Sequence, residues 1–165
     1  MHKSVQKLIH IEQLVKSKET NLNKGKASKI IAISKTFSLD KIMPLINYGH
    51  NDYGENKVQE ALDKWTVIKE KKPDLKLHLV GKLQTNKVKF AVKLFDFIHS
   101  VDSKKLAKKI SEEQSKLNKS VKIFLQVNIG NEEQKSGILK NELDDLYQYC
   151  NCLLYTSPSP RDTNE

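Results

Sequence analysis

Residues 29–40, with the sequence KIIAISKTFSLD, indicate the fold class of this chain. Ile30 to Ser34 is a short run rich in isoleucine, which is typical of a strand buried on both faces. Thr36 to Asp40 then opens a segment with helical spacing. Lys35 lies between the two, at the carboxyl end of the predicted strand, where α/β proteins place their functional groups. The stretch therefore predicts a strand–helix unit with a lysine at its junction.

Two interpretations of Lys35 remain open at this point. A chain with this many lysines can carry a solvated lysine at a strand end, with only its aliphatic stem against the surface. A partly desolvated lysine is more readily a neutral amine, which can attack an aldehyde and form an imine.

The strand–helix alternation continues along the chain. Strands are predicted at 29–34, 51–56, 75–80, 95–100 and 121–128, and helices at 5–15, 39–47, 57–71, 86–94, 104–117 and 139–150. This order predicts a parallel sheet with right-handed crossovers. Short, evenly spaced strands favour an incomplete α/β barrel of the (β/α)8 TIM type, with about five β/α units, over an open doubly wound sheet. The glycine fingerprint of a dinucleotide fold does not follow the first strand.

Composition narrows the class of protein. The chain has 165 residues and a net charge of +9, enough length for one domain. Arg161 is its only arginine, so the positive charge comes from scattered lysines and nucleic-acid binding is not expected. No run is long and apolar enough for a membrane span, and the N-terminus lacks a secretory signal, so we expect a cytoplasmic protein. Dispersed histidines and the pair Cys150 and Cys152 match no metal pattern, so no metal is expected.

Polar residues gather where the predicted strands end. They are Lys35, Glu55, Asn56, Gly81, Gln84, Asn86, His99, Ser100, Asp102 and Asn128. In a barrel these positions share one rim. Each also has a structural explanation, because Asn56, Asn86 and Asp102 can cap helices and Gly81 can serve a turn. A histidine inside a strand, such as His78, is more often a satisfied core residue.

Several motifs carry a family resemblance. They are ISKT at 33–36, YGENKVQE at 53–60, HLVGKLQTNK at 78–87, QVNI at 126–129 and KSGI at 135–138. In this order and spacing they resemble the pyridoxal 5′-phosphate (PLP) homeostasis proteins, the YggS/PROSC family, over about residues 8–148.

The resemblance implies a single-domain barrel like the N-terminal domain of alanine racemase. It implies that PLP is held as a Schiff base on Lys35, that Asn56 lies near the ring oxygen, and that His78, Gly81 and Gln84 line the pocket. Family members are regarded as monomeric PLP carriers without established catalysis, so no catalytic residue is expected. PLP-dependent apoenzymes are the implied partners.

Two other functions stay open from the residues alone. One is a PLP-dependent racemase or decarboxylase, which would need a proton-transferring group opposite the cofactor. The other is a basic nucleic-acid-binding module, for which the chain lacks interleaved aromatic residues.

The composition changes near Cys150. Residues 151–165 hold two of the four prolines and the only arginine, so we expect residues 1–150 to be a partial PLP-binding barrel and residues 151–165 a non-native tail. A barrel of this type commonly binds phosphate in the loops after its seventh and eighth strands. Those loops are missing from the five predicted units, and unpaired strand edges favour association. We therefore expect weak PLP binding and a tendency to associate.

Overall fold

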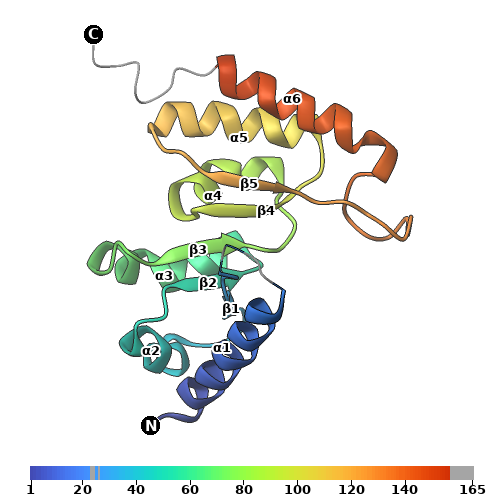
Figure 1. Cartoon of the computed structure of the whole chain (residues 1–165). Helices are drawn as coiled ribbons and strands as arrows, with labels where there is room; N and C mark the ends of the chain where they lie inside the picture. Colours follow the sequence, from blue (N-terminus) through green and yellow to red (C-terminus); the bar gives the residue numbers. More distant parts are fainter. Residues whose placement is uncertain (23–24, 26, 157–165) are drawn as a thin grey trace.

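The computed structural model describes residues 1–22, 25 and 27–156. Helices alternate with strands through this part of the chain (Figure 1). In order, the elements are α1 (Lys3–Asn21), β1 (Ala32–Ile33), α2 (Leu39–Tyr48), β2 (Asp52–Glu55), α3 (Val58–Lys71), β3 (Lys76–Leu79), the 3-10 helix η1 (Thr85–Lys87), α4 (Val88–Leu94), β4 (Phe97–Val101), α5 (Lys104–Leu117), β5 (Lys122–Leu125), the 3-10 helix η2 (Lys140–Glu142) and α6 (Leu143–Thr156).

The strands form one parallel sheet in the order β1-β2-β3-β4-β5. Each strand therefore pairs with the next along the chain, as in a barrel wall. In the described part of the chain β1 and β5 are the sheet edges, so the wall is not closed. The prediction of an incomplete TIM-type barrel is confirmed, and the doubly wound alternative is wrong.

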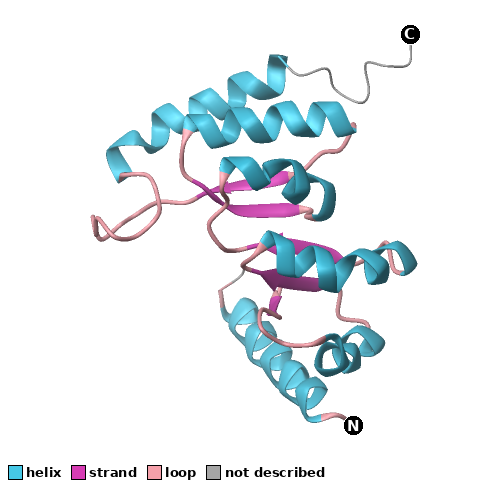
Figure 2. Cartoon of the chain, turned by 180° about the vertical axis from the view of Figure 1, so that it is seen from behind, coloured by secondary structure: helices cyan, strands magenta, loops and turns pink. Residues whose placement is uncertain are grey.

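One face of the sheet carries the hydrophobic core. Helices α3 and α4 lie behind the strands in Figure 1 and in front of them in the reverse view of Figure 2. Tyr53, Trp65, Leu77, Phe95 and Ile98 are fully buried in this layer. Fully burying side chains of this size contributes about 1.5–3 kcal/mol each before the entropy cost of ordering them. This packing holds the strand ends in register.

The opposite face of the sheet is only partly covered. Residues that pair across the strands share a face, and Gly54 lies opposite His78, which lies opposite Phe97. On this face Ile33 is 47% exposed and Phe124 is 50% exposed. The prediction that the first strand is buried on both faces is therefore wrong, because β1 is an edge strand whose inner side is not packed against other elements.

Specific residues mark the ends of three helices. Gly49 ends α2 in the left-handed conformation, with φ of 106°, as its position predicts. Ser103 rather than Asp102 caps α5, since its Oγ accepts a hydrogen bond from the Leu106 amide at 3.2 Å. Asn86 does not cap a helix as predicted, because it lies inside η1, which begins after Gln84.

The last described helix extends beyond the predicted boundary at residue 150. Helix α6 continues to Thr156, while residues 157–165, most of the predicted tail, lie outside the described residues. The assignment of residues 151–165 as a non-native tail stays a prediction. Among the described residues, no helix has the length and apolar character needed to cross a membrane.

Candidate functional site

The carboxyl ends of β1, β2 and β3 meet at one rim of the sheet. The Ser34 amide donates to the Gly54 carbonyl, and the Val80 amide donates to the Glu55 carbonyl, each at 2.9 Å. These bonds extend the strand pairing to the residues just before Lys35 and Gly81. The structure therefore brings the positions of Lys35, Asn56 and Gly81 to the same edge, as the parallel sheet predicts.

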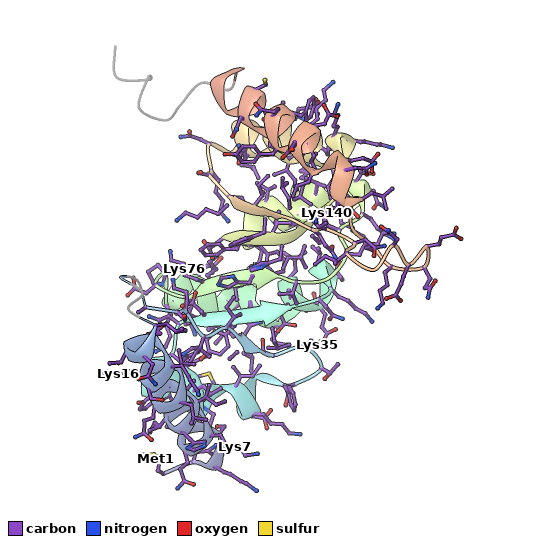
Figure 3. All side chains as sticks on the ribbon, turned by 45° about the vertical axis from the view of Figure 1, so that its right-hand side comes forward. Met1, Lys7, Lys16, Lys35, Lys76 and Lys140 are labelled. Atoms are coloured by element: carbon purple, nitrogen blue, oxygen red, sulfur yellow. The ribbon has the colours of Figure 1, made fainter. Side chains whose placement is uncertain are left out.

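Lys35 lies exposed at this rim (Figure 3). Among the described residues its amine has no hydrogen-bond or ion-pair partner. The next residue, Thr36, has φ of 67°, in the left-handed region that β-branched residues rarely adopt. Such backbone conformations cost about 1–3 kcal/mol and recur at functional sites. The chain thus presents a free amine on a strained turn.

Asn56 and Gly81 approach each other closely. A Cβ atom added to Gly81 would lie 2.1 Å from the Asn56 carbonyl oxygen, so glycine is required there. The Asn56 Oδ1 atom is buried and has no hydrogen-bond partner in the described part of the chain. Asn56 and Gln84 line a cavity of about 290 Å³ together with Lys57, Lys82 and Lys87. Lys35 is not part of that lining.

His78 lies on the inner face of the sheet in a chain of polar contacts. Its Nε2 is 2.9 Å from Asp52 Oδ1, and its Nδ1 is 2.9 Å from His99 Nε2. The ring also stacks on Phe97, with centroids 4.2 Å apart. Burial lowers the pKa of both His78 and His99, although Asp52 acts in the opposite direction on His78. Both ring nitrogens of His78 are therefore engaged within the protein.

A buried polar cluster supports the turn that carries Lys35. Glu55 is fully buried, and its Oε1 accepts hydrogen bonds from Ser34 Oγ and Lys64 Nζ at 2.8 Å and from Trp65 Nε1 at 2.9 Å. The sequence signalled Glu55 at the rim but not Lys64. A lysine beside Trp65, on a helix whose apolar side packs inward, is the signal that could have found it.

Asp102 and Asn128 organise the loop that follows β5. Asn128 Nδ2 donates to the Glu132 carbonyl at 2.8 Å, and Asp102 Oδ2 accepts from the Gly137 amide at 3.1 Å. Gly137 has φ of 121°. Ser100 Oγ is buried, without a hydrogen-bond partner among the described residues. Of the predicted rim residues, Asp102 and Asn128 thus stabilise the loop after β5.

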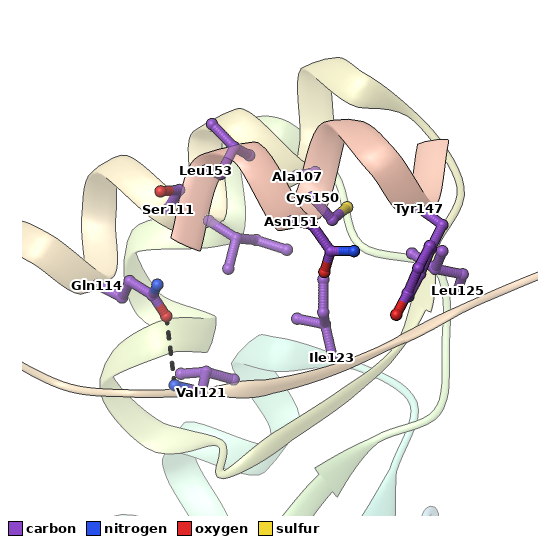
Figure 4. A pocket seen from close by; sticks show the side chains of 11 residues that line it. Ala107, Ser111, Gln114, Val121, Ile123, Leu125, Tyr147, Cys150, Asn151 and Leu153 are labelled. Atoms are coloured by element: carbon purple, nitrogen blue, oxygen red, sulfur yellow. Dashed lines mark hydrogen bonds between the residues drawn. The ribbon is translucent and has the colours of Figure 1, made fainter. Parts of the chain in front are cut away.

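A second cavity lies away from this rim, between α5, β5 and α6 (Figure 4). It has a volume of about 270 Å³ and a mainly aliphatic lining that includes Ile110, Leu125 and Leu153. Gln114 Oε1 accepts a hydrogen bond from the Val121 amide at 3.3 Å at one end. Burial raises the pKa of the Cys150 thiol, which disfavours the reactive thiolate. The polar residues of this lining are Ser111, Gln114, Tyr147, Cys150 and Asn151.

Comparison with known sequences agrees with this geometry. The sequence model of the alanine racemase N-terminal domain matches residues 9–154. The chain belongs to the alanine racemase N-terminal domain family. Within that family it is similar to the pyridoxal phosphate homeostasis protein of Pasteurella multocida, at 35% identity over 143 residues, or 82% of this chain and 61% of the relative. It is also similar to that of Aquifex aeolicus, at 37% identity over 139 residues, or 84% of this chain and 60% of the relative.

The chain is also similar to solved structures. Two structures of PipY from Synechococcus elongatus, without and with PLP bound, superpose with TM-scores of 0.66 and 0.64 at 37% and 35% identity. They cover 82% of this chain, which spans 65% and 64% of theirs. This member of the alanine racemase N-terminal domain family thus spans about 60% of the length of the curated relatives named above.

Proposed function

We propose that this chain binds PLP through the amine of Lys35 and acts in intracellular PLP homeostasis as a carrier without catalysis of its own. The observation that carries the proposal is the unpartnered Lys35 amine at the strand-end rim of an alanine racemase-type sheet. The names of the homeostasis relatives and the PLP-bound structure of PipY support it.

The residues at the rim have the chemistry that PLP needs. Lys35 supplies an amine for the aldehyde. The buried Asn56 Oδ1 has an unmet hydrogen-bonding capacity suited to a polar substituent of the ring. His78 lies in β3, and Gly81 and Gln84 lie in the segment that joins β3 to η1. When bound, PLP supplies the electron-withdrawing ring chemistry.

The engagement of His78 supports a carrier more than a catalyst. Proton transfer by His78 would require it to leave either Asp52 or His99, since each ring nitrogen already has a partner. Exchange of an amino acid's α-proton with solvent in the PLP-loaded chain would support the racemase or decarboxylase alternative. The carrier proposal predicts exchange no faster than with free PLP.

The proposal also specifies where the site lies in the chain, the cellular compartment and the partners. We place PLP binding within residues 1–150 and the protein in the cytoplasm, and we assign the monomeric state to the full-length family proteins, because the open strand edges of this chain favour association. PLP-dependent apoenzymes are the proposed recipients, because a carrier must release its cofactor to a protein that uses it. Neither a membrane nor a nucleic acid is a proposed partner.

Adduct mapping tests the attachment site. The chain is mixed with PLP, reduced with borohydride and analysed by peptide mass spectrometry, with Lys35→Arg as the matched variant. Lys119 is a demanding internal comparison, because burial, aided by Lys69, lowers its pKa to about 8 and so makes it more readily neutral. We expect modification mainly at Lys35. Even labelling across the lysines, or preference for Lys119 with Lys35 unmodified, would overturn the proposal.

A further inference from the structure

The two residues that flank Lys35 are both held by helix α3. The Thr36 amide donates to Glu60 Oε1 at 3.1 Å, and the carbonyl of Ser34 accepts from Lys64 Nζ at 2.9 Å. Glu60 and Lys64 are four residues apart, so they lie one turn apart on the same side of α3. Helix α3 therefore hydrogen-bonds to the backbone on both sides of Lys35, and the Lys35 amine has no partner among the described residues.

Glu55 closes this arrangement from the neighbouring strand. Its Oε1 accepts from Lys64 Nζ and from Ser34 Oγ, both at 2.8 Å. Trp65 Nε1 adds a third hydrogen bond at 2.9 Å. The Glu55 and Lys64 side chains are 0% and 9% exposed, so the ion pair is buried. Through Ser34, the residue before Lys35, it joins the end of the β1 segment to β2 and α3.

Stability alone is a poor explanation for an ion pair in this place. Removing two charges from water costs several kcal/mol per ion by order of magnitude, and well-packed apolar residues are often as stabilising. The Glu55 Oε2 atom is also buried without a hydrogen-bond partner in the described part of the chain, which adds to the cost. The pair does fix the orientation of Ser34, because Glu55 accepts a hydrogen bond from its hydroxyl and Lys64 donates one to its carbonyl.

The turn needs such support. Thr36 is strained at φ of 67°, and strain of this kind persists only where surrounding contacts hold it. The Phe37 amide donates to the Ser34 carbonyl at 3.2 Å, so that carbonyl receives both the turn bond and the Lys64 bond. Loss of Lys64 or Glu55 would leave Ser34 with its hydrogen bonds to the Gly54 carbonyl but remove a contact from α3 or β2, which would let the turn relax toward an unstrained conformation.

We propose that Glu55 and Lys64 are positioning residues, which hold the strand end so that the Lys35 amine projects from the rim in the geometry that cofactor attachment requires. This inference rests on the function proposed above. Neither residue is expected to contact the cofactor, since both side chains are buried and bonded to the protein.

The chain offers a closely matched control on the same helix. Lys69 also bonds one carboxylate and one backbone carbonyl, Asp96 Oδ2 at 2.5 Å and the Leu94 carbonyl at 2.6 Å, and it is not bonded to Ser34. Lys64→Met and Glu55→Gln are therefore compared with Lys69→Met in the full chain. Lys64→Arg serves as the conservative rescue, because a guanidinium can still donate to both acceptors.

The first readout does not involve the cofactor. Amide hydrogen exchange at Thr36 and Phe37 reports whether the turn is held. We expect Lys64→Met and Glu55→Gln to speed exchange there by about tenfold or more, and Lys69→Met to leave it unchanged. Equal exchange in all variants, with folding confirmed by circular dichroism, would overturn the inference while leaving the proposed function intact. Should Glu55→Gln fail to fold, Ser34→Ala, which removes the hydroxyl bonded to Glu55, takes its place.

The second readout is the ratio of PLP adduct at Lys35 to adduct at the exposed Lys3 within each variant, because Lys3 lies on α1, away from both Lys64 and Lys69. A misplacement of about 1 Å can cost up to about 100-fold in reactivity, so we expect this ratio to fall at least about tenfold in Lys64→Met. A purely structural role would leave the ratio unchanged in folded protein, and Lys64→Arg should restore it. A wild-type chain without preference for Lys35 would refute the proposed function instead, whereas hydrogen exchange would still decide the positioning role.

Discussion

Replacing Gly81 by alanine tests the closest backbone approach at the rim. The new Cβ would lie 2.1 Å from the Asn56 carbonyl oxygen and 2.8 Å from its carbonyl carbon and Cα. Ordinary contact begins near 3.4 Å, so the oxygen distance is short by about 1.3 Å. Every conflicting atom is backbone, and therefore the clash cannot be relieved by a rotamer change. One of the two segments has to move.

The expected cost is at the upper end of the range for overpacking, about 3 kcal/mol. That is a large part of the roughly 5–15 kcal/mol that stabilises an ordinary domain. In urea unfolding with a slope of about 2 kcal/mol per molar, the midpoint should fall by about 1.5 M. Movement of Asn56 should also weaken PLP binding, measured by the absorbance of the bound cofactor.

Two other glycines provide the controls for this substitution. Gly25→Ala should change stability by less than about 0.5 kcal/mol, because among the described residues no atom outside its chain neighbours lies within 4 Å of the position that the new Cβ would take. Gly54→Ala should cost less than Gly81→Ala, because its closest contact, at 2.6 Å, is the end of the half-exposed Ile33 side chain, which can move. A Gly81→Ala chain as stable as the Gly25→Ala chain would refute the reasoning.

Three further predictions concern other contacts. Acidification below about pH 6.5 should destabilise the protein, because the folded state lowers the pKa of His78 and His99, so the stability that they contribute is complete above the unfolded-state pKa and is lost as pH falls. The free energy of unfolding should fall by at most about 1.4 kcal/mol per pH unit for each histidine. Urea midpoints that do not change between pH 7 and 5 would contradict this. Lys119, with its pKa lowered to about 8, should be acylated at pH 8 faster than the exposed Lys3, as measured by competitive mass-tag labelling. The free energy of unfolding should also rise between about pH 8 and 10.5, as measured by pH-dependent unfolding, because in this range the unfolded chain binds the Lys119 proton more tightly than the folded chain does. Ser103→Ala should cost about 1 kcal/mol of unfolding free energy by removing the cap of α5, whereas Ser103→Asp should retain most of it.

The placement of function at a rim follows from the parallel sheet. Lys35, Asn56 and Gly81 follow three neighbouring strands, so the strand pairing alone brings them to one edge. The supporting contacts come from elsewhere. Lys64 lies in the helix after β2, and it reaches back to the carbonyl that precedes Lys35. The cofactor site proposed here would depend on the packing of α3 as much as on its own residues.

Much of the fold could be predicted because its determinants are local. The isoleucine-rich run before Lys35 and the helical spacing after it set one strand–helix unit, and its repetition implied a parallel sheet. The helix predicted at 104–117 matched α5 at both ends, because its helical periodicity is clear. Asn86 was misassigned because a cap depends on the backbone turn before the helix, and that turn is a 3-10 helix here.

Local sequence signals were enough for the order of strands and helices, for the lysine at the end of the first strand and for the motif that places Glu55 and Asn56 at the second. Which side chains meet became visible only once the chain was folded. His78 bonds to partners on two different strands, and Glu55 bonds to a lysine on a helix. Such contacts depend on strand register and on helix packing across the sheet, and local periodicity encodes neither of them.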